Sequence, residues 1–321
     1  MRVYQLLLCS TIILLLGVLT LIGTKVGGFW FDMECFKIWS AHIHTDGLSC
    51  TYTHWNNYMP VYQYIMKLYG VMMGTEARIL EYVRLLKGFT LAFEFLGLWF
   101  VWKWIDKRTD FLLLLCVNML NIAYSYNSVI WGQVDGIHTM MVFAAMYYAC
   151  ERKIMLSAVW YLLAMNMKLQ AIVFLPPLAL IYLYHVLDTK KWQLIPYVVL
   201  MVSIGQALIL WPFLRIENGF ALFWKQVTSA TSIYPQVSLK AMNFWNLVVC
   251  GDTEQIPDKK IFISGLSYRM TGLLLFFASS FAALWPLLKM VWNKLAGKAI
   301  TMLAKEKIWL VCALIAILFY F

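Results

Sequence analysis

The chain has 321 residues, of which 62% are hydrophobic and only 13% are charged. Soluble domains are roughly 45–50% apolar and about a quarter charged, so this composition excludes an ordinary soluble protein. The net charge of +10 does not indicate a nucleic-acid-binding protein, because the basic residues are dispersed between apolar runs. We expect one polytopic membrane domain, residues 1–321, whose cytoplasmic loops follow the positive-inside rule.

Nine apolar segments can cross, or nearly cross, a hydrocarbon core of about 30 Å as helices. They cover residues 4–24, 88–104, 111–123, 136–150, 154–165, 170–187, 192–214, 261–288 and 308–321. The first could be a signal peptide, but no small-residue cleavage site precedes Lys25, so we interpret it as a span. The predicted fold class is therefore an all-α membrane bundle of about nine transmembrane helices.

Charge predicts the topology of these spans. If the N-terminus is cytoplasmic, every short loop that faces inward is basic. These loops carry Lys103, Lys107, Arg108, Arg152, Lys153, Lys190, Lys191, Lys289, Lys294, Lys298, Lys305 and Lys307. The two long loops, residues 25–87 and 215–260, then lie on the extracytoplasmic side.

The first outer loop is predicted to hold two amphipathic helices lying on the membrane surface. Helical spacing relates Phe36, Trp39 and Ile43, and a second apolar series follows it. That second series consists of Tyr62, Ile65, Met66 and Tyr69. Cys35 and Cys50 share this loop, so a disulfide could join them.

The segment of residues 154–187 is too long for one membrane-spanning helix and short for two. A polar interruption at 166–170 contains Lys168, and Pro176 and Pro177 follow it. We predict two short helices that meet at a recessed external cavity, because irregular backbone at membrane depth must line protein or water.

Three acidic residues are candidates for chemistry. Asp32 and Glu34 follow the first span and two glycines, where a carboxylate could act as a general base or bind a metal. Alternatively, Asp32 caps the helix that begins there. Glu94 lies within the second span, where ionisable groups are costly, so it is either functional or a paired structural carboxylate.

Two further groups fall on the outer side. Lys168 could hold an anionic phosphate while Gln170 binds a hydroxyl, although a snorkelling lysine is the simpler interpretation. Trp131, Gln133 and Asp135 could stack on a sugar and bind its hydroxyls. An interfacial tryptophan and a helix-capping aspartate explain them equally well.

Three histidines in the first outer loop could suggest a metal site. His42, His44 and His54 lie near Asp46. Such a pattern also arises by chance in a polar loop, so the sequence leaves the metal ligands unknown.

Several short segments occur in a characteristic order. They are residues 32–40, Tyr58-Met59-Pro60-Val61-Tyr62, Arg84-Leu85-Leu86-Lys87, Glu94, Trp131-Gly132-Gln133-Val134-Asp135, Lys168-Leu169-Gln170-Ala171 with Leu175-Pro176, and Asn243-Phe244-Trp245. This order, which covers most of the chain, resembles the GT-C superfamily of integral membrane glycosyltransferases, in particular its bacterial members. Leu169 departs from it, because the family usually has proline there.

The resemblance implies a polyprenyl-phosphate-linked sugar donor and an extracytoplasmic active site, in a bacterial inner membrane. It also implies inverting transfer of a hexosyl group, such as mannosyl or glucosyl, to a saccharide or lipid-linked acceptor. The expected catalytic residues are Asp32 and Glu34, and the expected donor phosphate ligands are Lys168, Gln170, Arg84 and Arg215. The expected sugar and acceptor ligands are Trp131, Gln133, Asp135, Glu94, Asn243 and Trp245.

A divalent cation, Mg²⁺ or Mn²⁺, could assist the leaving phosphate, but the sequence does not show its ligands. Two other classes of protein remain open. A lipid or solute transporter or flippase would also combine broken helices with buried charges. The second alternative is a non-catalytic membrane subunit.

Overall fold

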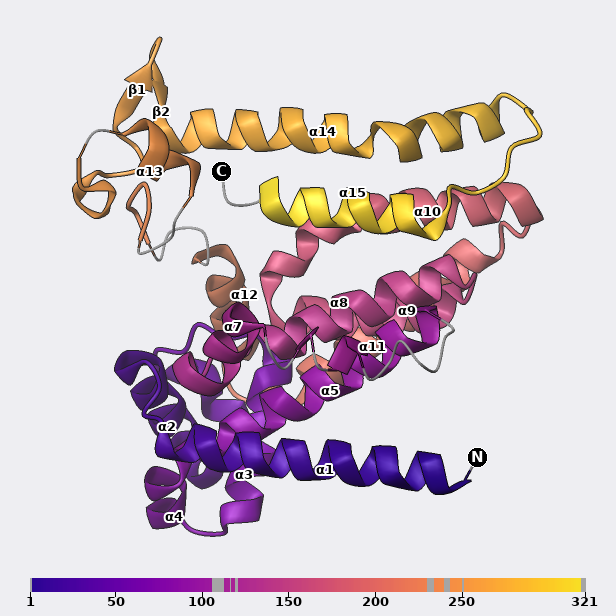
Figure 1. The fold of residues 1–321 in the computed structure, drawn as a ribbon. Helices are drawn as coiled ribbons and strands as arrows, with labels where there is room; N and C mark the ends of the chain where they lie inside the picture. Colours follow the sequence, from indigo (N-terminus) through magenta and orange to yellow (C-terminus); the bar gives the residue numbers. More distant parts are fainter. Residues whose placement is uncertain are drawn as a thin grey trace. The chain divides into compact units, whose positions relative to one another are not determined.

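A computed structural model describes residues 2–105, 113–115, 117–118, 121–229, 234–239, 243–249 and 251–318 (Figure 1). Most of the described chain is helical, which confirms the all-α fold class at that level. The chain divides into two compact units, Met1–Ala171 with Val198–Gln226, and Ile172–Tyr197 with Val227–Phe321.

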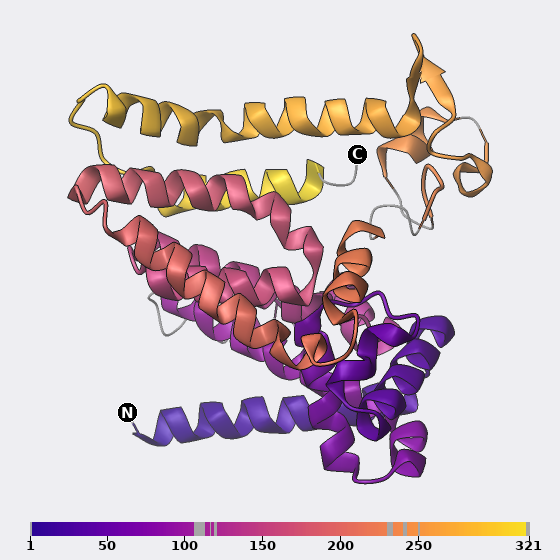
Figure 2. The same ribbon diagram turned by 180° about the vertical axis from the view of Figure 1, so that it is seen from behind.

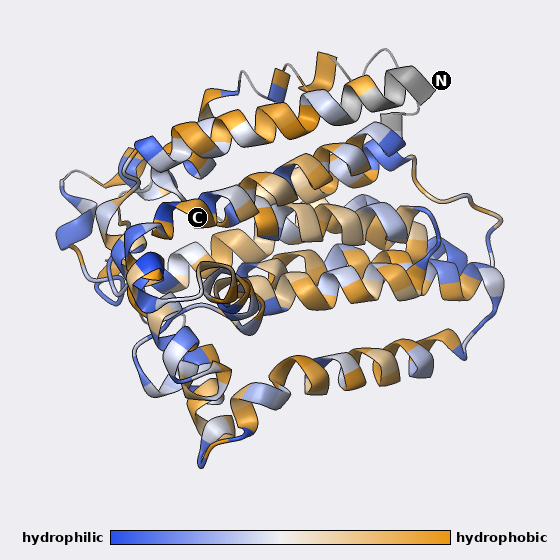
Figure 3. Cartoon of the chain, turned by 90° about the horizontal axis from the view of Figure 1, so that it is seen from below, coloured by the Kyte–Doolittle hydropathy of each residue, from blue (hydrophilic) through white to orange (hydrophobic). Residues whose placement is uncertain are grey.

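Four helical segments of the described chain are long and apolar enough to cross a membrane. They are Val83–Trp104, Leu169–Thr189, Leu194–Leu214 and Tyr268–Leu295, and the hydropathy colouring in Figure 3 shows such long apolar helices. A bent pair, Ser10–Lys25 with Trp30–Thr45, would make a fifth span. The chain is therefore a membrane protein by the length and composition of its helices, and the total of nine spans stays a prediction.

Five long helices belong wholly or largely to the first unit. They are α1 (Arg2–Lys25), α5 (Leu86–Ile105), α8 (Asp135–Cys150), α9 (Ile154–Met167) and α11 (Leu194–Leu210). The first four pack in series, α1 on α5, α5 on α8 and α8 on α9. Only 6% of the apolar window of α11 is buried, which suits a helix that faces lipid rather than water.

A pair of amides ties α11 to α9. Asn166 Nδ2 donates to Gln206 Oε1 at 2.7 Å, and Gln206 Nε2 donates to Asn166 Oδ1 at 3.0 Å. Tyr64 Oη adds a hydrogen bond of 2.8 Å to the carbonyl of Ile209. Polar contacts therefore position a helix that buries little apolar surface.

Helices are present in residues 25–87, while their predicted place on the outer membrane surface stays a prediction. This part contains α2 (Trp30–Thr45), η1 (Leu48–Thr53), α3 (Pro60–Met73), α4 (Glu76–Glu81) and η2 (Val83–Leu85). The residues chosen by helical spacing are all buried, for example Phe36, Ile43, Tyr62 and Met66. Because α2 turns from α1 by 104°, we treat α2 as lying outside the first span. The suggested disulfide is wrong, because Cys35 and Cys50 are both free thiols.

The predicted interruption at 166–170 is confirmed. Helix α9 ends at Met167, Lys168 is extended (φ −154°, ψ 129°), and a 3₁₀ segment, η4 (Leu169–Phe174), leads to α10 (Leu175–Thr189). The proline after Leu175 stands in the first turn of α10, where its missing N–H costs nothing.

The predicted span at 111–123 lies partly outside the described residues. Its end is seen as α7 (Ile122–Ser125), which continues into η3 (Tyr126–Trp131), a π-helical segment. Further along the chain, η5 (Trp211–Leu214) ends the predicted span at 192–214, and α12 (Gly219–Ser229) lies in the predicted loop at 215–260.

The second unit contains α10, α13 (Phe244–Val248), η7 (Thr253–Gln255), β1 (Ile261–Ile263), β2 (Leu266–Ser267), α14 (Tyr268–Leu295) and α15 (Lys305–Leu318). Helix α14 contacts both α10 and α15, and Figure 2 shows this group from behind. Lys294 Nζ of α14 forms an ion pair of 2.6 Å with Asp188 of α10. An ion pair therefore reinforces the packing of α14 on α10.

The predicted start of a span at 261 is wrong. Residues 261–267 form an antiparallel hairpin, because Ser264 and Gly265 both have positive φ, which suits a two-residue turn. Helix α14 begins only after Ser267, whose side chain accepts a hydrogen bond from the N–H of Met270 at 3.2 Å.

A buried lysine joins α5 to two other segments. Lys87 is 2% exposed, and its ammonium donates to the carbonyls of Gly23 (3.1 Å), Val26 (3.0 Å) and Val129 (2.8 Å). The first two carbonyls belong to the end of α1 and the residue after it, and the third belongs to η3. Lys87 thus satisfies carbonyls that helix ends leave without partners.

Replacing Lys87 by Met should lower the free energy of unfolding by about 3 kcal/mol, because hydrogen bonds from a charged donor are each worth about 1.5–3 kcal/mol. Unfolding by SDS titration in mixed micelles measures the change. Lys103→Met on the same helix is the control, and it should cost less than about 1 kcal/mol, since the contact of Lys103 within the described residues is with the ring of Trp99. Equal losses in the two variants would contradict the role of Lys87.

Candidate functional site

The start of α2 is attached to the end of η3. The backbone N–H of Phe29 donates to the carbonyl of Trp131 at 2.8 Å. Gly28 makes this approach feasible, because its φ is +92° and a Cβ there would lie 3.0 Å from the same carbonyl oxygen. As a result, Asp32 in the first turn of α2 faces the residues that follow η3.

Two side chains hold the carboxylate of Asp32. Trp131 Nε1 donates to Asp32 Oδ2 at 3.1 Å, and Gln133 Nε2 donates to the same oxygen. The backbone N–H groups of Gly132 and Gln133 both donate to the carbonyl of Asn127, at 3.0 and 2.9 Å. The turn that carries Gln133 is therefore fixed, and with it the direction of the amide that reaches Asp32.

Asp32 is partly buried, and burial raises the pKa of its carboxyl group above the usual value. The hydrogen bond from Trp131 and the charge of Lys168 oppose this rise in pKa, while Asp135 adds to it. Since Lys168 and Asp135 act on Asp32 electrostatically, the four elements α2, η3, α8 and the break after α9 contribute to one charged cluster.

Lys168 and Asp135 form an ion pair within this cluster. The extended backbone of Lys168 at the break directs its Nζ to Asp135 Oδ1, in the first turn of α8. Their side chains are 25% and 42% exposed, so the pair remains open to solvent. A lysine has three N–H donors, so this one can bind Asp135 and still donate to an anionic ligand.

Glu94, the third acidic candidate, is buried and has its own partners. Its side chain is 5% exposed, and Ser128 of η3 donates a hydrogen bond to Glu94 Oε1. Gly136 packs directly on this carboxyl group, because a Cβ at Gly136 would lie 2.8 Å from Glu94 Cδ. The structure thus shows Glu94 linking α5 to η3 and α8.

The structure does not bring Glu34 to Asp32. Two residues along a helix differ by about 200° in direction, so the two carboxylates leave α2 on different faces. Glu34 pairs with Lys37 at 3.0 Å, and both line a separate cavity of about 680 Å³. Arg84 lines the same cavity and donates to the carbonyl of Thr24 at 3.2 Å.

The remaining predicted site residues are described by their own surroundings. Gln170 in η4 and Arg215 after η5 are exposed. Asn243 and Trp245 belong to the second unit, where Trp245 is 3% exposed and packs on Phe262 and Tyr268. Trp245 therefore has the surroundings of a core side chain in its own unit.

Sequence reasoning missed several residues that build the site. Tyr58 Oη reaches Gln133 Oε1 at 3.5 Å, Ser128 binds Glu94, and Lys87 supports η3. The signal for Lys87 was available, because a lysine at the start of an apolar span must find partners or reach the interface. Tyr58 stands in a segment that carries the resemblance, but neither Tyr58 nor Ser128 was chosen as a site residue.

Comparison of the chain with models of protein families, with curated proteins and with solved structures found no match. The site must therefore be interpreted from its own geometry. In chemical terms, it offers a carboxylate oriented by two N–H donors and a partly exposed ammonium group that acts on this carboxylate electrostatically.

We predict measurable coupling between Lys168 and Asp135. Lys168→Met and Asp135→Asn should each lower the free energy of unfolding, and the double variant should be less destabilised than their sum by about 1 kcal/mol, a modest value because the pair is partly exposed. SDS-unfolding titrations of the four proteins test this. The cycle of Lys37→Met with Glu34→Gln is the control, with an expected coupling of about 0.3 kcal/mol. Additive losses at Lys168 and Asp135 would contradict the ion pair.

Proposed function

We propose that this protein is an inverting membrane glycosyltransferase that uses a polyprenyl-phosphate-linked sugar. The acceptor is a hydroxyl of a saccharide or of a lipid-linked saccharide on the extracytoplasmic side of a bacterial inner membrane. The observation that carries the proposal is the carboxylate of Asp32, which Trp131 and Gln133 orient beside the ammonium of Lys168.

The reaction needs a base for the acceptor and stabilisation for the leaving group. Asp32 takes the proton of the acceptor hydroxyl while the hydroxyl oxygen attacks the anomeric carbon of the donor. The bond between that carbon and the phosphate oxygen breaks, and its electron pair leaves with the polyprenyl phosphate. Both described hydrogen bonds to Asp32 reach Oδ2, so Oδ1 is the oxygen that receives the proton.

Lys168 is the cation that stabilises the departing phosphate. It is partly exposed, and its charge lowers the pKa of Asp32, which supports a role for both groups at one substrate. Arg84 is less suited to this role, because it lines the cavity that contains Glu34 and Lys37. A divalent cation at the phosphate remains compatible with this chemistry.

The direct test is sugar transfer by the purified protein in nanodiscs, with a panel of radiolabelled polyprenyl-phosphate sugars and native lipid extract as acceptor. Donor consumption with formation of a labelled product supports the enzyme. Movement of an unaltered labelled lipid across a liposome membrane would instead indicate a flippase. Neither activity, in a protein that co-purifies with an enzyme, would indicate a non-catalytic subunit.

Asp32→Asn should reduce transfer by about 10²–10⁴-fold, because it removes general-base catalysis but keeps the size of the side chain. Glu34→Gln is the matched control on the same helix, and it should keep activity within about threefold, since this is far below the effect of losing a base. Initial rates at saturating donor measure both. Full activity in Asp32→Asn, or an equal loss in Glu34→Gln, would remove Asp32 from the mechanism.

The acidic limb of kcat/KM against pH should report the ionisation of Asp32 in the free enzyme. The Trp131 hydrogen bond lowers the pKa of Asp32, so Trp131→Phe should raise that pKa and move the acidic limb to higher pH. Activity is then lost earlier as the pH falls.

Trp30→Phe is the control for this profile, because Trp30 is 73% exposed. It should leave the acidic limb in place. A limb that stays unchanged in Trp131→Phe, or moves to lower pH, would show that Asp32 is not the titrating base.

A further inference from the structure

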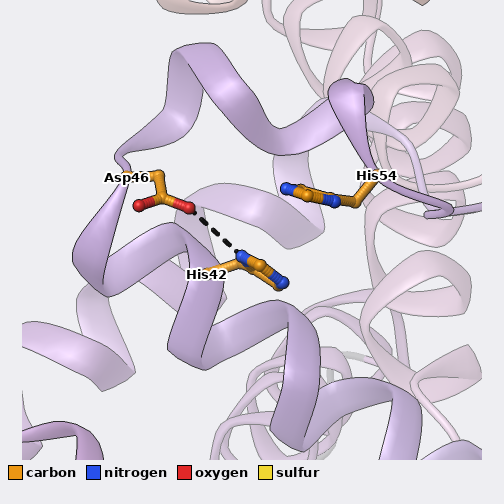
Figure 4. A group of neighbouring side chains, drawn as sticks. All are labelled: His42, Asp46 and His54. Atoms are coloured by element: carbon orange, nitrogen blue, oxygen red, sulfur yellow. Dashed lines mark hydrogen bonds and ion pairs between the residues drawn. The ribbon is translucent and has the colours of Figure 1, made fainter.

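Three side chains at the far end of α2 bring their ligand atoms together. His42 lies in the last turn of α2, Asp46 is its C-cap, and His54 follows η1 (Figure 4). One ligand atom from each residue lies within 4.8 Å of the other two. This is the one group of three or more such ligands in the part of the chain that the structure describes.

The backbone explains why these three residues meet. His42 and Asp46 are four residues apart and share a helix face, and His42 Nδ1 lies 3.1 Å from Asp46 Oδ2. Gly47 has a φ of +84°, which lets the chain reverse and run back over α2 through η1. Trp39 Nε1 then donates to the carbonyl of Trp55 at 2.7 Å, which anchors the residue next to His54.

The two imidazoles are stacked, with ring centroids 4.1 Å apart and an angle of 23° between the rings. A neutral imidazole is the form that binds a metal ion. Asp46 supplies the carboxylate ligand, and one of its oxygens already lies beside the His42 imidazole.

His44 does not belong to the group, although it lies closer to His42 in sequence than Asp46 does. A Cβ built on Gly70 would lie 3.4 Å from His44 Nδ1, so His44 faces α3. The other side of the group opens on a cavity of about 400 Å³, lined by His42, Asp46, Thr45 and Glu76. This space can hold metal-bound water, and Glu76 can bind that water.

We propose that His42, Asp46 and His54 form a site for a zinc-class transition-metal ion. Two imidazoles and one carboxylate are ligands that suit Zn²⁺, with water at the fourth position. Tetrahedral coordination at about 2.0–2.1 Å from the metal places ligand atoms about 3.3 Å apart. His42 and Asp46 are 40% and 44% exposed, so rotation of these side chains can close the remaining distance.

The ion would join the C-terminal end of α2 to the segment after η1. Asp32 lies ten residues earlier on α2, about 15 Å along the helix axis, so the metal does not take part at Asp32. Its effect is structural: it stabilises the folded first outer loop, in proportion to the occupancy of the site.

Equilibrium binding of Zn²⁺ to the purified, metal-stripped full chain in detergent tests the site. We expect one equivalent to bind with a dissociation constant of about 10 µM or lower. Co²⁺ gives a second readout that does not depend on activity, because tetrahedral Co²⁺ has characteristic visible absorption bands. Zn²⁺ should also raise the Tm, and EDTA should reverse this rise.

His54→Gln should weaken Zn²⁺ binding at least tenfold and abolish the tetrahedral Co²⁺ bands, and Asp46→Asn should weaken Zn²⁺ binding. His54 is exposed, so its variant should keep the Tm of the metal-free protein. His44→Gln is the control and should bind Zn²⁺ like the wild type. Unchanged affinity in His54→Gln, an equal loss in His44→Gln, or wild-type affinity weaker than about 1 mM would overturn the proposal.

Discussion

The ammonium group of Lys87 holds together the backbone segments on which the candidate site is built. It binds carbonyls at the end of α1 and in η3, and these two segments position the residues on either side of the site. Asp32 follows the first segment, Trp131 ends the second, and Gln133 comes two residues later. A lysine is suited to this place because three N–H donors can serve carbonyls from different helix ends at once. A buried charge without partners is costly. Separation of these segments would leave the Lys87 ammonium in that state, so its charge opposes their separation.

The carboxylates of the first unit differ in what surrounds them. Asp32 is oriented by two N–H donors and lies near a cation, whereas Glu94 is enclosed by Ser128 and Gly136. Glu34 is paired on the helix surface with Lys37. A proton acceptor needs both a fixed direction and access for its substrate, and Asp32 is the residue among these three that combines them. This distinction is the reason for proposing Asp32, rather than Glu34 or Glu94, as the base.

Hydropathy predicted a helix well where charged residues flank the apolar run. An example is α9, which begins after Lys153 and ends before Lys168. It failed at residues 261–267, because a short apolar run has the same composition in a strand and in a helix. The Ser264-Gly265 turn was the signal against a helix there. At the site, the separation of Glu34 from Asp32 follows from helix geometry alone and was predictable. The hydrogen bonds from Trp131 and Gln133 join residues about a hundred positions apart, so only a resemblance could suggest their grouping.

The reciprocal amide pair between Asn166 and Gln206 has a further consequence for α11. Apolar side chains that face lipid fit equally well at many axial positions, so they do not select a register. Sliding α11 by one turn, about 5.4 Å, would leave both amides without partners in an apolar medium. The two hydrogen bonds of this pair therefore help to fix the axial position of α11, which its lipid-facing side chains do not specify. A single buried asparagine fixes the register of a coiled coil in the same way.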